Sequence, residues 1–230
     1  MCYHYALAAP PAELAARYRK EKQEVEDYIK TYHISAFTHS ECPVITTDPQ
    51  IQLYRWGLIP FWTKTVEDAM EIRNRTINAR SETAFEKPSF REAVKHKRCL
   101  VPATGFYDWR HDEGKKIPYY ISLKEECIFS FAGIYDAWHN PVTGEQLHIF
   151  SILTTDANPM MRYIHNTNFR MPVILHEEEE SLWLDPLADE ATLEKLFSPY
   201  DESAMQAYMV DPGFLKMNPH DPNILARSEA

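Results

Sequence analysis

The sequence predicts a mixed α+β domain that is dominated by strands. Short segments rich in β-branched and aromatic residues recur along the chain, bounded by Pro, Gly, Asn or Asp. Few segments show the apolar spacing that is typical of a surface helix. At 230 residues with 44% hydrophobic composition, the chain is long enough for one substantial core. We therefore expect residues 1–230 to form a single domain.

The first expected element is a surface helix within Pro11–Lys30, because proline suits a first helical turn and apolar residues follow at helical spacing. Strands are then expected at His33–Phe37, Val44–Thr46, Ile51–Ile59, Cys99–Ala103, Tyr119–Leu123, Cys127–Trp138 and Leu147–Thr154. Helices are expected at Ser89–His96, Pro159–Ile164, Glu177–Leu184 and Thr192–Phe197. Residues 211–230, which contain Pro and Asn, are expected to be a loosely structured C-terminal tail.

The net charge of −10 is unevenly distributed along the chain. Residues 177–230 hold 13 acidic and 3 basic side chains, a balance of −10, whereas residues 1–176 hold 21 of each. Within Glu71–Arg98, eight basic residues accompany four acidic ones, which is enough for a local groove that meets phosphates. A solvated charged face is the alternative. The acidic balance therefore does not exclude a nucleic-acid partner.

The sequence has neither a recognisable targeting signal nor a clustered cysteine motif. No segment approaches the roughly 20 apolar residues of a membrane helix, and the first residues lack the layout of a secretory signal. We expect a cytoplasmic protein that is not bound to a membrane. The cysteines have no CxxC spacing, so we expect reduced thiols rather than a zinc ribbon or a disulfide scaffold. They are Cys2, Cys42, Cys99 and Cys127.

Cys2 becomes the N-terminal residue if Met1 is removed, and it then carries both a thiol and a free α-amine. The unperturbed pKa values are about 7.7–8.0 for the amine and about 8.5 for the thiol, so both nucleophiles are available near neutral pH. Such a pair suits an aldehyde, because the amine forms a Schiff base and the thiol closes a five-membered thiazolidine. A cysteine without function at this position is the alternative.

Polar residues alternate at Asn78, Arg80 and Glu82, which places them on one face of an extended segment. They are suited to orient a sugar hydroxyl, to bind a phosphate and to support the arginine. A surface strand that enters a capping turn explains the same pattern.

Asp108 is a single carboxylate among Phe106, Tyr107 and Trp109. Desolvation by aromatic neighbours raises the pKa of a carboxyl group, which suits proton transfer near neutral pH. A turn hydrogen bond is the other common use of aspartate.

Two further stretches suggest a nucleic-acid enzyme. His165 lies between a predicted helix and a following strand, where a histidine can move protons near pH 7, although a purely structural histidine is also common. Residues 54–62, which include Arg55 and Trp62, mix aromatic rings with a cation, as single-stranded nucleic-acid sites do. A buried strand is consistent with the same residues.

Five motifs, taken in this order, resemble the SOS response-associated peptidase (SRAP) family, also called abasic-site processing proteins. They are the N-terminal Met-Cys, Arg-Trp-Gly-Leu-Ile-Pro, Asn-Ala-Arg-Ser-Glu-Thr, Cys-Leu-Val-Pro-Ala-x-Gly-Phe-Tyr, and His followed by Arg-Met-Pro-Val-Ile-Leu. The resemblance runs from Cys2 to about Leu175. It implies two packed antiparallel sheets that form a barrel-like core with peripheral helices. It also implies single-stranded DNA with abasic sites as partner, a covalent DNA–protein cross-link as product, and an autopeptidase activity that removes Met1.

The resemblance also implies roles for individual residues. Cys2 resembles the cross-linking nucleophile, Asn78 the group that positions it, and His165 the acid or base that opens the sugar ring. Asp108 stands where the family usually has a glutamate. The implied DNA contacts are a phosphate clamp at Arg80, a base wedge at Trp62, a polar contact at Thr154, and Arg170.

The chain also departs from the family pattern. The family commonly begins Met-Cys-Gly-Arg, whereas this chain has Tyr3 and His4, and His4 would replace the arginine at a phosphate only when protonated. Residues 166–169 lengthen the link between His165 and Arg170.

Other functions remain open at this point. A thiol peptidase that uses Cys2 and His165 is one alternative, and a non-catalytic reader of single-stranded or modified DNA is another. A metal site at Cys2 and His4 lacks further ligands at a recognisable spacing. We expect no metal, no small-molecule cofactor and a monomer.

Overall fold

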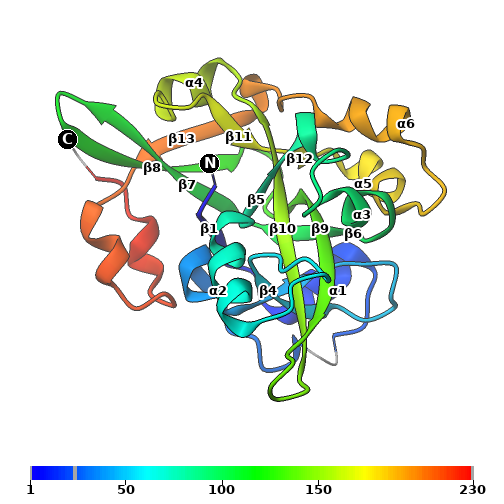
Figure 1. Cartoon of the computed structure of the whole chain (residues 1–230). Coiled ribbons are helices and arrows are strands. Elements are labelled where there is room, and N and C mark those ends of the chain that lie inside the picture. Colours follow the sequence, from blue (N-terminus) through cyan, green and yellow to red (C-terminus); the bar gives the residue numbers. More distant parts are fainter. Residues whose placement is uncertain (1, 23–24, 229–230) are drawn as a thin grey trace.

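Two β-sheets form the centre of the molecule, and helices cover its edges (Figure 1). The computed structural model describes residues 2–22 and 25–228. The strands are β1 (His4–Leu7), β2 (Thr31–Ser35), β3 (Glu41–Val44), β4 (Gln52–Trp56), β5 (Asn78–Arg80), β6 (Arg98–Ala103), β7 (Gly105–Asp112), β8 (Lys115–Leu123), β9 (Phe129–His139), β10 (Gln146–Asp156), β11 (Arg170–Pro172), β12 (Ile174–Leu175) and β13 (Met205–Met209). The α-helices are α1 (Pro11–Tyr18), α2 (Val66–Arg75), α3 (Arg91–His96), α4 (Pro159–Ile164), α5 (Glu177–Leu184) and α6 (Glu190–Glu194).

The fold class predicted from the sequence is confirmed, because the molecule is mixed and rich in strands. One sheet has the order β13-β8-β7-β1-β2, and every pairing in it is antiparallel. The second sheet has the order β12-β9-β10-β4-β3, with β5 and β11 on β10 and β6 on β9. Within the described residues the strands do not close into a barrel, so the expected barrel-like core is two separate packed sheets.

The second sheet is mixed rather than antiparallel, which corrects the expectation of two antiparallel sheets. Strands β4 and β5 both run parallel to β10. Parallel neighbours need long crossover connections, and β10 is separated from both strands by more than sixty residues of sequence. Ile149–Thr155 of β10 are all buried, as expected for a strand that is covered on both faces.

The predicted helices and strands are largely present, with altered ends. Helices α4 and α5 have the predicted bounds, but α1 ends at Tyr18, because Arg19 adopts a left-handed backbone with φ of 53° and caps the helix. No helix was predicted at the position of α2. Strand β7 begins at Gly105, where only glycine fits. A Cβ at this position would lie 2.2 Å from the ring of Tyr120.

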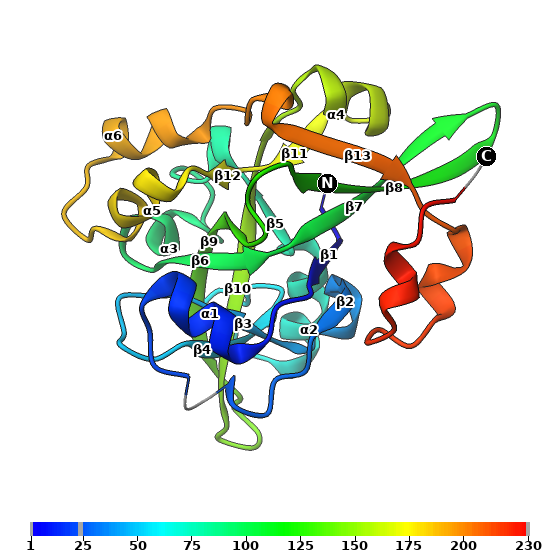
Figure 2. The same cartoon turned by 180° about the vertical axis from the view of Figure 1, so that it is seen from behind.

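Residues 211–228, expected as part of a loosely structured tail, contain two 3-10 helices, η6 (Pro212–Lys216) and η7 (Pro222–Leu225). The side chains of Phe214 and Ile224 are buried, and the Phe214 ring stacks on Tyr107 with 4.6 Å between ring centroids. A segment without periodic apolar residues gives little signal in the sequence, although two anchoring side chains are enough to hold it. This segment lies beside β7 and β8 (red in Figures 1 and 2).

The acidic helices α5 and α6 lie at one side of the molecule, away from β1, in both views (Figures 1 and 2). Much of the acidic surplus is therefore remote from Cys2. Among the described residues, no helix has the length and the apolar character that are needed to cross a membrane.

Candidate active site

Separate elements bring the four predicted catalytic residues together at the start of β1. The register of β1 on β7 pairs His4 with Tyr107, so the residues that precede His4 lie alongside Asp108 and Trp109. Asn78, the first residue of β5, donates from Nδ2 to the carbonyl oxygen of Cys2 over 2.8 Å. Both figures draw β1 beside β7 (Figures 1 and 2).

His165 reaches this point from the end of α4, and Asp108 reaches it from β7. His165 Nδ1 lies 3.6 Å from Asp108 Oδ2 and 2.9 Å from the carbonyl oxygen of Arg170. Because the carbonyl can only accept, Nδ1 carries the proton and Nε2 is the basic nitrogen of the neutral ring. The backbone N–H of Trp109 donates to Asp108 Oδ1 over 2.8 Å and fixes the carboxyl group.

Burial controls the acidity of both groups. Burial, with a smaller contribution from the Asp108 charge, raises the pKa of the Cys2 thiol to about 12. Burial also raises the pKa of Asp108 above its ordinary value, although His165 partly opposes the rise. The direction for Asp108 agrees with its aromatic surroundings in the sequence.

A reaction at the Cys2 sulfur requires that the sulfur be open to solvent, and in this structure it is not. Cys2 has no exposed surface in a chain that carries Met1 before it. The thiol is therefore protonated at neutral pH and closed to solvent in this form. Any reaction at the sulfur needs an opening of this region.

A surface pocket of about 380 Å³ lies directly over the Asp108–His165 pair. It lies between the β7–β8 hairpin, the loop after His165 and the segment that contains Leu215. Its lining residues are Tyr3, His4, Asp108, Trp109, His111, Lys116, His165, Thr167, Asn168 and Leu215. The pocket gives a ligand access to the carboxyl and imidazole groups. We call it the reaction pocket.

His4 lines the reaction pocket, but its ring is uncharged. Its Nδ1 lies 2.8 Å from Nε2 of His33, and the two rings stack with 5.0 Å between centroids. Burial, and then the neighbouring His33, lower the pKa of His4 to about 3. A protonated His4 that replaces an arginine at a phosphate is therefore not expected near neutral pH.

Three of the predicted DNA contacts have accessible side chains. The exposed fraction is 64% for the Arg80 side chain and 44% for Trp62. Arg55 is 41% exposed, and its Nη2 lies 3.3 Å from Glu41 Oε1. These three residues are available to a strand on the surface.

Thr154 and Arg170 are placed differently. Thr154 is fully buried, and the Arg170 side chain is 5% exposed. The Arg170 guanidinium binds both carboxylate oxygens of Glu82 and lies 3.0 Å from Asp156 Oδ1. With these partners in place, neither Thr154 nor Arg170 offers a surface to DNA. Their contacts instead support the carbonyl that accepts from His165.

The basic run within Glu71–Arg98 is only partly a surface feature. Arg73 and Arg98 are buried, and Arg98 donates to the backbone carbonyls of Trp183 and Val94. Lys97 lies 2.5 Å from Asp136. The remaining exposed cations of this run are Arg75, Arg80, Lys87, Arg91 and Lys95.

Two features of this region were not predicted from the sequence. His33 belongs to a predicted strand, but strand spacing alone does not indicate that its ring meets His4. Glu82 was expected to support Arg80, yet it binds Arg170 closely and its Oε2 lies 3.9 Å from Arg80 Nε. Across residues 2–22 and 25–228, no group of three or more His, Cys, Asp or Glu side chains could hold a metal ion.

Comparison with known proteins adds the family. The sequence model of a family described as SOS response associated peptidase (SRAP) matches residues 1–216. The chain belongs to the SRAP family. The resemblance noted in the sequence is thereby confirmed.

Individual SRAP relatives carry more specific names. The abasic site processing protein YoqW of Bacillus subtilis (strain 168) is 46% identical over 158 residues, which cover 68% of this chain and 67% of YoqW. The abasic site processing protein HMCES of Gallus gallus is 36% identical over 172 residues, covering 65% of this chain and 50% of HMCES. A crystal structure of a protein from Bacteroides thetaiotaomicron is 47% identical, with a TM-score of 0.97 over 99% of this chain and 100% of that chain.

Proposed function

We propose that this SRAP protein processes abasic sites in single-stranded DNA by forming a covalent cross-link through Cys2 after Met1 has been removed. The observation that carries the proposal is the convergence of Cys2, Asn78, Asp108 and His165 beside one pocket. The names of the relatives, abasic site processing proteins, support the same substrate.

The acidity of the two nucleophiles of Cys2 sets the order of steps. An α-amine with a pKa of about 7.7–8.0 is partly unprotonated near neutral pH, whereas burial raises the pKa of the thiol to about 12 in the chain that still carries Met1. The amine therefore attacks the ring-opened aldehyde first, and loss of one water leaves an imine. The thiol then adds across the C=N bond, with sulfur on carbon and the proton on nitrogen, and closes the thiazolidine.

The surrounding groups have separate roles in this scheme. Asn78 holds the Cys2 carbonyl and thereby orients the terminal residue. Asp108, whose pKa is raised by burial, is suited to donate the proton that the departing hydroxyl of the carbinolamine needs. His165 Nε2 acts as the base that opens the sugar ring, while the Arg170 carbonyl fixes the ring through Nδ1.

Trp62, Arg80 and Arg55 supply the binding surface in this proposal. An abasic nucleotide has no base to stack, so its neighbours and its phosphates must provide most of the affinity. His4 acts as a neutral hydrogen-bonding group rather than as a cation. The reaction needs no metal or small-molecule cofactor, and we expect a monomer to carry it out.

A thiol peptidase that acts on other proteins is less well supported. Such an enzyme needs a thiolate at neutral pH, and the pKa of about 12 opposes this. Removal of Met1 stays part of the proposal, by the chain's own activity or by an aminopeptidase. Self-cleavage through the Cys2 thiol needs the same opening of this region, because burial raises the pKa of that thiol as long as Met1 is present.

The test is adduct formation between methionine-free protein and a single-stranded oligonucleotide with one abasic site. We expect a product that survives denaturing electrophoresis, and Cys2→Ala should abolish it. Cys2→Ser should give an adduct only when cyanoborohydride is present, because the hydroxyl traps the imine poorly and reduction makes the link permanent. Lack of any adduct with wild-type protein, alongside a reactive SRAP relative, would refute the proposal.

A further inference from the structure

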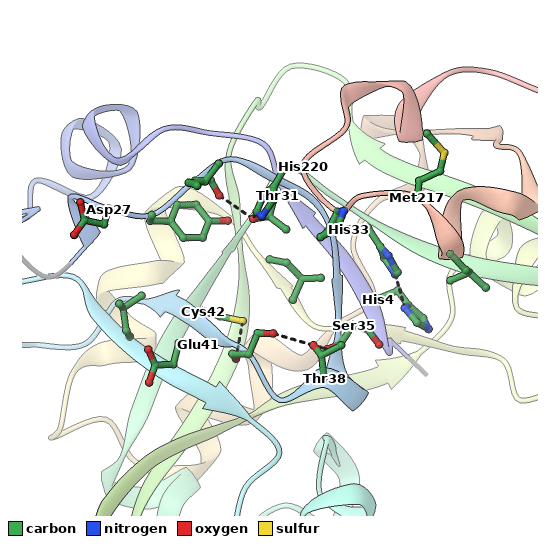
Figure 3. Close-up of a pocket in the computed structure, with 17 residues that line it drawn as sticks. His4, Asp27, Thr31, His33, Ser35, Thr38, Glu41, Cys42, Met217 and His220 are labelled. Atoms are coloured by element: carbon green, nitrogen blue, oxygen red, sulfur yellow. Dashed lines mark hydrogen bonds between the residues drawn. The ribbon is translucent and has the colours of Figure 1, made fainter.

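A second pocket of about 690 Å³ adjoins the reaction pocket (Figure 3). It is formed by β2, the start of β3, Leu53 of β4, the loop at Asp27–Ile29 and the segment that runs from Leu215 to His220. His4 and Leu215 line both pockets, so His4 stands between them. We call it the β2 pocket. Its volume lies within the range of small-molecule sites, about 300–1,000 Å³.

The chemistry of the β2 pocket does not suit a phosphate. None of the described residues that line it is a lysine or an arginine, and its charged groups are the carboxylates of Asp27 and Glu41. Of its three imidazoles, which come from His4, His33 and His220, burial lowers the pKa of the first two, so His4 and His33 are neutral near pH 7. An anion would gain no attraction there, whereas an uncharged group that carries amino hydrogens would find acceptors.

The lining combines an apolar floor with a polar rim. The more buried side chains of Ile34, Cys42 and Leu53 give the floor, and Figure 3 shows the hydroxyls of Ser35 and Thr38 at one side. Leu215, which is 48% exposed, and the half-buried Met217 add further apolar surface. A nucleobase has the same division, with flat apolar faces and polar edges.

The His4–His33 pair supplies a matching edge. Each neutral ring has one N–H and one bare nitrogen, and the 2.8 Å contact uses one of each. Among the described residues, Nε2 of His4 and Nδ1 of His33 have no partner, and neither atom is fully buried. One of these two nitrogens must therefore donate while the other accepts. A concerted shift of protons exchanges the two roles, so the pair can meet different bases.

We propose that the β2 pocket binds the nucleobase next to the abasic nucleotide, on one side of it, while the baseless sugar occupies the reaction pocket. The inference rests on the proposed function, because the substrate is the same strand. His4 lies two residues from Cys2 on the same face of the chain, about 6.6 Å along an extended strand. Asp27 and Glu41, which Figure 3 draws at the other side of the pocket from His4 and His33, keep the lining acidic and disfavour a phosphate in the place of the base.

The experiment compares rates of adduct formation at limiting DNA concentration. Each oligonucleotide carries one abasic site, and its 5′ or 3′ neighbour is either a normal nucleotide or tetrahydrofuran, a baseless sugar without an aldehyde. Wild-type protein should lose about 5- to 100-fold in rate when the base is removed on one side only, as expected for one bound base.

Variants that fill the β2 pocket test whether the effect of the neighbouring base arises there. The two filling variants are Thr38→Trp, at the rim, and Leu53→Trp, at the floor. For each variant, the rate with the neighbouring base divided by the rate without it should approach one. Thr38 is exposed and Leu53 is only partly buried, and thermal melting checks that each variant folds. Leu187→Phe, at a position that is 90% exposed on another part of the surface, is the matched control and should keep the wild-type ratio.

The outcomes separate the two proposals. Adducts that form at rates independent of both neighbouring bases overturn the inference and leave the proposed function intact. A wild-type ratio that persists in both folded filling variants places the base on another surface, such as Trp62, and also overturns it. Absence of adduct with every oligonucleotide overturns the proposed function and this inference with it.

Discussion

Asp108 combines a cost to stability with a use in chemistry. A carboxyl group whose pKa is higher in the folded than in the unfolded chain stabilises the fold only while it is protonated. That contribution is complete below the unfolded pKa, about 3.9, and is lost as the pH rises through the folded value. Because burial raises the pKa of Asp108, its ionised form destabilises the fold near neutral pH.

Asp108→Asn should therefore raise the melting temperature at pH 7, and the gain should vanish near pH 3. The amide cannot move protons, so the rate of adduct formation should fall by about 10²- to 10⁴-fold. Thermal melting at the two pH values and single-turnover kinetics measure the two effects. A variant that is less stable than wild type at pH 7 would contradict the role that we give to burial.

At the same scale, the sequence indicated which side chains carry the chemistry but not how they contact one another. Cys2, Asn78, Asp108 and His165 were all named from residue type and motif, because their chemistry is intrinsic. The contact of His4 with His33 and the burial of Thr154 depend on packing between distant strands, which spacing within one segment does not encode.

At the scale of elements, α4 holds His165 in place. Asn158 caps this helix, since its Oδ1 accepts from the backbone N–H of Met161 over 2.8 Å, and its Nδ2 donates to the carbonyl of Tyr200 over 2.7 Å. The bounds of α4 were predictable because proline follows the capping residue at the first helical position. The αL cap at Arg19, which ends α1, has no such signal because arginine rarely adopts that backbone.

Asn158→Ala should lower the free energy of unfolding by about 1–2 kcal/mol and also slow adduct formation, because the end of α4 carries His165. Asp189 caps α6 in a comparable way, since its Oδ1 accepts from the backbone N–H of Thr192 over 2.8 Å. Asp189→Ala removes this cap. That control should lose stability without a change in adduct rate. Chemical denaturation and adduct kinetics provide the two readouts. Equal kinetic effects of both substitutions would contradict a positioning role for α4.

At the scale of the whole molecule, the pairing of strands that are distant in the sequence determines the features of the fold that were not predicted. Strand β10 joins β9 and β11, the strands before and after it in the sequence, to β4 and β5, which are distant in the sequence. Alternating and apolar runs predict that such strands exist, but their neighbours follow from how the sheets cover one core. The mixed direction of the second sheet was missed for this reason.

The segment after Val210 is held to the rest of the molecule by its buried side chains. Phe214 is fully buried against Tyr107, so Phe214→Ala should cost about 3–5 kcal/mol of unfolding free energy. If residues 1–230 form one domain, this loss should shift a single cooperative transition in chemical denaturation. The exposed Leu215 provides the control, and Leu215→Ala should cost much less. A negligible effect of Phe214→Ala would indicate that the segment is loosely attached.

The most direct measurement of the central claim is the intact mass of the cross-linked product, followed by mapping of the modified peptide. We expect the mass of the methionine-free protein plus that of the oligonucleotide minus one water, with the link on Cys2. A link on a lysine, or a product that retains Met1, would contradict it.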